Sequence, residues 1–495
     1  MTVAPRGANM AERTLGRPKC SPPQVVVRHG RLVRLAPTVP PDPPPPSAAA
    51  TLTADGSRRL APSGGTTAAI ILLVVVIFLP NIWTLGSLNL SPALLYLILG
   101  FVPLLGFWLA GRAGSRLLSD WLVLGFAAWA AGTRFILLDT GAALEPAGVV
   151  LLQTAGAYLA GRVLVRDLAA TRLAFGAAII GVIAMLPFLL WEAVTGTKPL
   201  LDLAGLFGST LTATHMDPRW GFSRAQGGFE HPILLGIYCA TLVSPALFLF
   251  DGPRGRALRW VGTPCVAIAA VTSLSTGALL SMNTQIALIG WNALLREVRK
   301  RWTTLLWLVA ALYVAVDTLS NRTPFHLFVD YATFNSQSSY NRILIWEFGS
   351  AAVMQSPLLG HGTDDWERPA FMHASMDNFW LVIAYRYGVT GVALLLGAFL
   401  FTIVKIARWP SPGGDFDRAR YGVLFALVAT MIAIVSVHLW NNSYIWLIFM
   451  LGAVSWMVDV PSSAAPAEAS DASRETHSAQ TAGDMRRARL RRLGF

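Results

Sequence analysis

Apolar segments long enough to cross a bilayer recur along the chain from Thr67 onward. A transmembrane helix needs about 20 mainly apolar residues. Twelve segments approach this length, and they predict an all-α polytopic membrane domain over 67–459. They are 67–85, 91–110, 118–138, 146–165, 173–194, 231–250, 258–274, 277–294, 303–319, 378–406, 420–439 and 442–459. Only a short Ser-Thr-Gly turn near Ser275 separates the seventh from the eighth, so these two are open to a different division.

Polar tails flank this domain. Residues 1–66 are rich in Pro, Ala and Arg, and residues 460–495 are polar and end in an arginine cluster. Such segments have few apolar side chains to bury, so both tails are predicted to be disordered. The first apolar run also begins too far from Met1 to be a signal peptide.

The basic residues alternate between connections. Every second connection is rich in Lys and Arg, and these five hold 16 of them, whereas the longer alternate connections hold six. Basic residues gather in cytoplasmic loops, so both termini are predicted to be cytoplasmic. The net charge of +12 therefore reflects topology, and no motif supports nucleic-acid binding. The 13% content of charged residues, against about 25% in soluble domains, agrees with a membrane protein.

Two predicted outer connections, 195–230 and 320–377, are long, and loops of this length are usually functional or disordered. The second is predicted to contain a helix that begins at Ser338 or Ser339 and ends after Gln355. This helix either lies on the membrane surface or packs as an ordinary loop helix. The large outer loop between the ninth and tenth spans is thus expected to hold short helices.

The tenth segment is longer than a bilayer requires. Its 30 residues from Asp377 to Ile406 would extend about 45 Å, whereas a bilayer core is about 30 Å thick. The stretch from Asp377 to Arg386 is therefore expected to project from the membrane or to line a wet cavity. Gly388 and Gly391 mark where the helix can bend.

Arginines in the two long connections are candidates for binding an anion. Arg224 lies just before the sixth segment, and Arg342 lies in the predicted loop helix with Trp346 on the same face. A guanidinium binds phosphate oxygens through a planar fork. The two arginines either converge on one polyanionic group or are independent solvated side chains. Glu230 and His231 lie beside Arg224 at the predicted outer mouth of the bundle.

Charged groups near the tenth segment are further candidates. Asp377 either caps the helix that follows it or accepts a proton as a general base. Arg386 and Arg134 lie near membrane depth, where a charge is costly and often functional; either could instead reach the interface or pair with a carboxylate such as Asp139.

Loop histidines such as His361 and His373 are more often structural or solvent-facing. No spacing of His, Cys, Asp or Glu predicts a metal site, and no cofactor motif is present. Three Cys are also too few for a disulfide framework.

Four short motifs follow one another in the predicted outer loops: Arg224…Gly228-Phe229-Glu230-His231-Pro232, Asn341-Arg342-x-x-x-Trp346, Pro357-Leu358-Leu359-Gly360-His361-Gly362 and Asp377-Asn378…Gly388-x-x-Gly391. In this order they resemble the motifs of the O-antigen ligase and polymerase superfamily of bacterial inner membranes, and the likeness covers about 67–459.

This resemblance implies a metal-independent glycosyltransferase without a cofactor, whose substrate is an oligosaccharide on a polyprenyl pyrophosphate in the membrane lipid. Arg224 and Arg342 match arginines that hold the pyrophosphate, and Asn378 matches the Asn of the family's His-Asn step. The expected site adds Asp377 as a third catalytic residue, with substrate contacts from the remaining polar groups and Trp346. Chain-length regulator and flippase proteins are the implied partners.

One departure guides the choice of reaction. The family's ligases have His where this chain has Asp377. We therefore favour a polymerase of lipid-linked repeat units for exopolysaccharide or O-antigen synthesis. The alternatives are a ligase that transfers the glycan to lipid A core or another acceptor, and a transporter or flippase without chemistry. A transporter would show internal repeats and broken helices near the midplane, and no clear repeat is present.

Overall fold

The computed structural model describes residues 62–331, 336–408 and 414–458, except Arg322, together with two strands near the N-terminus. These strands, β1 (Val25–Arg28) and β2 (Arg31–Arg34), pair antiparallel in a unit of their own, Met1–Leu60, where no regular structure was predicted. The disorder predicted for the rest of 1–61 and for 460–495 lies outside the described residues, whereas 64–66, also predicted to be disordered, form the first turn of the helix Gly64–Phe78.

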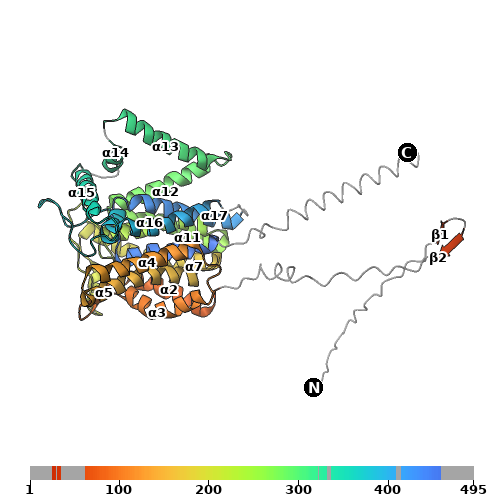
Figure 1. The fold of residues 1–495 in the computed structure, drawn as a ribbon, viewed down its shortest axis with the longest axis horizontal. Coiled ribbons are helices and arrows are strands. Elements are labelled where there is room, and N and C mark those ends of the chain that lie inside the picture. The colour runs from red at the N-terminus through yellow and green to blue at the C-terminus, as the bar shows by residue number, and fades with distance from the viewer. Residues whose placement is uncertain are drawn as a thin grey trace, which may run out of the picture. The chain divides into compact units, whose positions relative to one another are not determined.

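The second unit is mainly helical (Figure 1). Its helices are α2 (Gly64–Phe78), α3 (Pro92–Leu109), α4 (Leu118–Leu137), α5 (Thr140–Leu151), the π-helix η2 (Leu152–Gly156), α6 (Ala157–Leu164), α7 (Leu168–Thr195), α8 (Pro199–Gly205), α9 (Pro232–Ala240), α10 (Val243–Leu249), α11 (Gly252–Thr272), α12 (Thr276–Leu294), α13 (Arg301–Leu319), α14 (Pro324–Tyr331), α15 (Ser336–Gln355), α16 (Phe379–Arg408), α17 (Gly414–Ala433), α18 (Asn441–Val454) and the 3₁₀-helix η3 (Ser455–Val458). A hairpin of β3 (Trp83–Leu85) and β4 (Leu88–Leu90) joins α2 to α3.

Helices occupy all twelve predicted segments, but seven spans among the described residues are long and apolar enough to cross a membrane. They are Pro92–Leu109, Leu118–Leu137, Thr140–Leu164, Leu168–Thr195, Pro232–Leu249, Arg301–Leu319 and Phe379–Arg408. α2 has only 15 residues, and α11 and α17 begin with charged turns, which explains why length and composition do not select them. The chain is thus an all-α membrane protein with at least these seven candidate spans.

The core of the bundle forms around α18, where every residue from Asn442 to Val454 is buried. Two glycines allow α18 to cross α6 closely. A Cβ added to Gly161 would lie 2.2 Å from the Phe449 carbonyl oxygen, and one added to Gly452 would lie 2.2 Å from that of Tyr158. Small residues at such crossings let membrane helices pack backbone against backbone.

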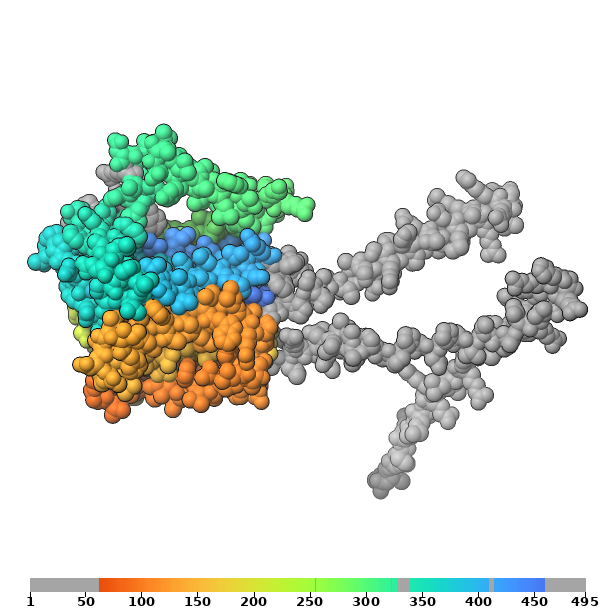
Figure 2. Space-filling view, viewed as in Figure 1, coloured from red at the N-terminus to blue at the C-terminus, as the bar shows by residue number. Residues whose placement is uncertain are grey.

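α13 contrasts with this core. None of its residues is buried, and beyond its first turn, where Trp302 packs against Tyr421 and Phe425 of α17, it stands away from the bundle (Figures 1 and 2). It is nevertheless one of the seven candidate spans. An apolar helix that is exposed on all sides is stable only in an apolar surrounding, so lipid is the solvent that suits it.

The two ends of the bundle differ. One end, here called the loop end, carries the connections 196–231 and 320–378, and α14 and α15 cover part of it (Figure 1). The other end carries the basic connections. There Arg172 pairs with Asp415 (2.9 Å) and Arg418 pairs with Asp251 (2.6 Å), which ties three of these connections together.

The predicted loop helix is present as α15. It ends at Gln355, as predicted, but it begins at Ser336, so the prediction that Ser338 or Ser339 starts the helix is wrong by one turn or less. The predicted bend in the tenth segment is confirmed: α16 breaks at Gly388, which has φ 72° and ψ 176°. α11 and α12 are separate helices on either side of Ser275.

Candidate functional site

Two arginines of the first long loop bind the turn between α11 and α12. The Arg224 Nε donates to the carbonyl oxygen of Ser273 (3.1 Å). The Arg219 Nη1 donates to the carbonyl oxygen of Leu274, the next residue (2.6 Å). Adjacent carbonyls thus hold two guanidinium groups side by side at the loop end.

Arg342 reaches the same turn from α15. Its Nη2 donates to the Thr276 hydroxyl (3.0 Å), and its Nε donates to the carbonyl oxygen of Ser436, which precedes α18 (3.1 Å). The two long loops therefore converge as the sequence suggested, with Arg219 as an additional member. We call Arg219, Arg224 and Arg342 the arginine cluster.

A buried ion pair fixes the backbone that carries Arg224. Lys198 Nζ pairs with Glu192 at the end of α7 and donates to the Arg224 carbonyl oxygen (3.1 Å). The Glu192 carboxylate also accepts from the backbone N–H groups of Gln226 (2.7 Å) and Gly227 (3.1 Å). Gly227 has φ +57°, a backbone conformation that favours glycine, so this position of the turn requires a glycine.

Burial and mutual repulsion shape the electrostatics of the cluster. Burial and the charges of Arg219 and Arg342 together lower the pKa of Arg224 to about 10, and Asp377 acts in the opposite direction. Burial also lowers the pKa of Arg342, again with Asp377 acting in the opposite direction. Arg224 stays cationic at pH 7. Three cations facing one carboxylate leave a net positive site that suits an anion with more than one charge.

Asp377 is not the cap of α16, and that alternative is wrong. The Asn378 Oδ1 accepts from the backbone N–H of Leu381 (3.0 Å), so Asn378 caps the helix. The Asp377 Oδ1 accepts instead from the Ser375 hydroxyl (2.5 Å). Asn378 is the cap because its side-chain oxygen reaches a backbone N–H of the first turn. The Asp377 carboxylate does not bond to the helix and can face the arginine cluster.

His231 lies at the start of α9, beside the cluster. Its Nδ1 accepts from the backbone N–H of Ile233 (3.1 Å), so the neutral ring carries its proton on Nε2. Burial and the Arg224 charge lower the pKa of His231 to about 4, against the opposing effect of Asp377. The ring is therefore neutral at pH 7. Burial raises the pKa of the adjacent Glu230 to about 7, and its Oε2 has no hydrogen-bond partner among the described residues.

The kink of α16 is matched by the turn that follows α15. A Cβ on Gly388 would lie 1.9 Å from the carbonyl oxygen of Leu358, so no other residue fits there. The Val389 N–H donates to the carbonyl oxygen of Pro357 (2.7 Å). Backbone groups that the kink frees are thus satisfied by this turn.

The same turn sets the position of Arg386. The N–H of His361 donates to the Tyr385 carbonyl oxygen (2.7 Å), and that of Gly362 donates to the Arg386 carbonyl oxygen (3.2 Å). The His361 ring stacks on Tyr385 (4.7 Å between centroids), and its Nε2 lies 2.9 Å from the carbonyl oxygen of Ala352. His361 thus contacts both α15 and α16 and joins the two helices.

The remaining candidates lie apart from these contacts. His373 is exposed, and Trp346 is 45% exposed and packs against Phe325 of α14 (5.0 Å between ring centroids). Arg134 of α4 neither reaches the surface nor pairs with Asp139, since it is 3% exposed and donates to the Tyr387 hydroxyl (3.2 Å).

Sequence reasoning missed three positioning residues. Arg219 and Lys198 were counted only as loop charges. Glu192 is a buried carboxylate within an apolar segment. A carboxylate there is costly unless it is paired, so its position in the sequence could have revealed a structural role.

Among the residues that the structure describes, no three His, Cys, Asp or Glu side chains form a group that could hold a metal ion. No protein family model and no curated protein matches the chain. The geometry of the site is therefore the basis for assigning a function.

Proposed function

We propose that the chain is a membrane glycosyltransferase that polymerises polyprenyl-pyrophosphate-linked oligosaccharide repeat units. In this proposal twelve helices span the inner membrane of a bacterium, both termini are cytoplasmic, and the loop end faces the periplasm. Basic connections at the opposite end support this orientation through the positive-inside rule. The product is an exopolysaccharide or O-antigen chain.

The observation that carries the proposal is the convergence of Arg219, Arg224 and Arg342 on one turn opposite Asp377. A pyrophosphate bears several negative charges, and arginines bind such groups through charge-assisted hydrogen bonds. Their position at the loop end suits a headgroup at the membrane surface, with its polyprenyl chain among apolar helices.

In the proposed reaction, the arginine cluster acts on the leaving group and Asp377 acts on the attacking hydroxyl. The acceptor hydroxyl oxygen attacks the anomeric carbon of the donor sugar, and the bond from that carbon to the pyrophosphate oxygen breaks. The leaving pyrophosphate takes the bonding electron pair, and the arginine cluster stabilises its growing charge. Asp377 accepts the proton of the attacking hydroxyl. No metal ion is needed, because the guanidinium groups neutralise the leaving group.

The test uses purified protein and a lipid-linked repeat unit as both donor and acceptor. We expect a ladder of products. Arg224→Ala and Arg342→Ala should each lower turnover about 100-fold, the usual cost of removing one donor to a developing anion. Asp377→Asn should lower kcat by about the same factor, with folding retained. Arg112→Ala, an exposed change in a basic connection, is the matched control.

The outcomes separate the alternatives. Products that form only when a second, unrelated acceptor is added would favour a ligase. Sugar movement across vesicles without any new glycosidic bond would favour a transporter. Near-normal turnover in both arginine variants would refute the pyrophosphate role.

A further inference from the structure

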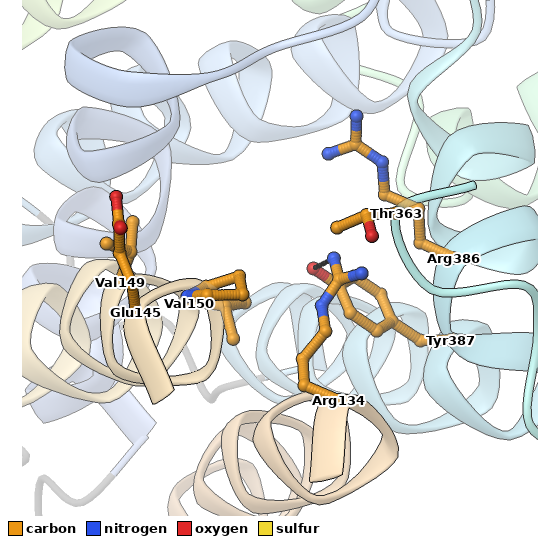
Figure 3. Close-up of a pocket in the computed structure, with 8 residues that line it drawn as sticks. Arg134, Glu145, Val149, Val150, Thr363, Arg386 and Tyr387 are labelled. Atoms are coloured by element: carbon orange, nitrogen blue, oxygen red, sulfur yellow. Dashed lines mark hydrogen bonds between the residues drawn. The ribbon is translucent and has the colours of Figure 1, made fainter. Parts of the chain in front are cut away.

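A second cationic site lies between α4, α5 and α16. A cavity of about 320 Å³ is lined there by Arg134, Glu145, Thr363, Arg386 and Tyr387, among others (Figure 3). Ligand pockets of roughly 300–1,000 Å³ hold small molecules or parts of larger ones. Figure 3 shows both guanidinium groups extending toward the open space, with Glu145 across from them.

Arg134 has unused hydrogen-bonding capacity in this cavity. It is 3% exposed, and its Nη2 donates to the Tyr387 hydroxyl (3.2 Å) while its guanidinium lies over the Tyr387 ring (5.1 Å to the centroid). Its Nε and Nη1 have no hydrogen-bond partner among the described residues. Burying two guanidinium nitrogens without hydrogen-bond partners costs free energy, so their retention points to a ligand that pairs with them.

No carboxylate neutralises the pair. Among the described residues, neither Arg134 nor Arg386 has an acidic group within ion-pair distance, and Glu145 pairs with neither. Gly362 leaves one side of Arg134 open, because an added Cβ would lie only 3.3 Å from its Nη1. Two guanidinium groups around a polar cavity match the oxygens of a phosphate.

A row of aromatic rings connects this cavity to the arginine cluster. The His231 ring lies 6.0 Å from that of Trp440, and Trp440 lies 5.5 Å from His438. The Arg386 charge in turn acts on His438, where it adds to burial in lowering the pKa of that ring to about 3. The cavity and the cluster are therefore neighbours at the loop end, separated by neutral rings.

We propose that the pocket of Arg134 and Arg386 binds the phosphate of a second lipid-linked repeat unit, while the arginine cluster holds the first. The assignment to a second repeat unit rests on the proposed function. Polymerisation joins two molecules that each carry a pyrophosphate, so a second cationic site would hold the pyrophosphate that does not leave. Transfer to an acceptor without a pyrophosphate requires only one. Glu145 is placed to accept a hydrogen bond from a hydroxyl of the bound group.

Isothermal titration of the purified protein with inorganic pyrophosphate tests the pocket without requiring turnover. We expect two sites in the wild type. The double variant Arg134→Gln/Arg386→Gln should bind one pyrophosphate, and Arg342→Gln should weaken the other site about 10- to 100-fold. Arg112→Gln, at the opposite end, should bind as the wild type does. The melting temperature of each variant confirms that it is folded, and Arg134→Lys, which keeps the charge, should retain part of the affinity.

Equal stoichiometry in the wild type and the double variant overturns the inference. Loss of a site in the double variant with no effect of Arg342→Gln would support the pocket but refute the proposed function. A parallel titration with undecaprenyl pyrophosphate in detergent identifies the source of the phosphate. Two bound lipids per chain support a second carrier, whereas one bound lipid with two inorganic pyrophosphates makes the pocket a free-anion site and overturns that assignment.

Discussion

Two buried arginines near opposite ends of α4 have opposite surroundings. Arg162 of α6 is 1% exposed, and its Nε pairs with Asp120 of α4 (3.0 Å). Its other nitrogens donate to the carbonyl oxygens of Ala113 and Ser115. Asp120 is equally satisfied, since it also accepts from Trp108, Leu117 and Tyr158.

Arg134 lies at the other end of α4. It is buried to a similar extent, but one hydroxyl is its only hydrogen-bond partner among the described residues. The contrast separates two uses of the same side chain. A saturated guanidinium holds helices together, and an unsaturated one keeps donors available for a ligand. The loop end, with its orphaned Arg134 and Glu230 atoms, has kept such groups, whereas the Arg162 site has not.

The largest expected effect is the loss of the Arg162 site. Asp120→Asn leaves a buried arginine without its counter-charge, and breaking one partner of a buried pair costs about 3–5 kcal/mol. Chemical denaturation in detergent, followed by tryptophan fluorescence, measures the free energy of unfolding. The control is Asp139→Asn, an exposed position near Arg134, which should change stability by less than about 0.5 kcal/mol. A small effect at Asp120 would contradict the division into a structural and a functional arginine.

A smaller effect concerns the pH dependence of stability at the loop end. The pKa of Glu230 is about 7 in the folded protein, above its ordinary value of 4.5, because burial disfavours its charge. The folded state therefore binds more protons than the unfolded state between these pKa values, so this contribution is full below pH 4.5 and is lost as pH rises through 7. The loss is on the order of 3 kcal/mol, since the two pKa values differ by about 2.5 units and one unit corresponds to about 1.4 kcal/mol.

Glu230→Gln should remove this part of the pH profile of the melting temperature between pH 5 and about 8, without changing the profile below pH 4. Asp202→Asn, in α8 of the same long loop, is the matched control. An unchanged slope in Glu230→Gln would mean that Glu230 is not the titrating group, and that its unpartnered oxygen does not distinguish the loop end.

Hydrophobic pattern predicted the helices of this fold well, because apolar segments of fixed length dominate the sequence. The helix in the second long loop and the kink at Gly388 were also predictable from local signals. The break between α9 and α10 was missed, although Pro245 lacks the N–H that would bond the Thr241 carbonyl in a continuous helix. Counting apolar segments gave twelve spans because the count ignored the charged first turns of helices such as α11 and α17.

The site was predictable in its charges but not in its contacts. Arg224 and Arg342 could be paired from the sequence because both flank long loops. Arg219 and Glu192 act through backbone groups of residues distant in sequence, Leu274 and Gln226 respectively. Nothing in sequence spacing encodes such contacts. The choice between Asp377 and Asn378 as cap likewise depends on side-chain direction, since Asp377 bonds to Ser375 and Asn378 bonds to the Leu381 N–H.

The smallest expected effect compares the two arginines directly. Arg134→Met replaces an incompletely paired buried charge with an apolar side chain of similar length, so we expect the free energy of unfolding to rise by about 1 kcal/mol. Arg162→Met should lower it by several times that amount, because Asp120 is left buried without its cation. The same denaturation experiment measures both. If Arg134→Met destabilises the protein as much as Arg162→Met does, then Arg134 is a structural residue, and its free donors are not held for a ligand.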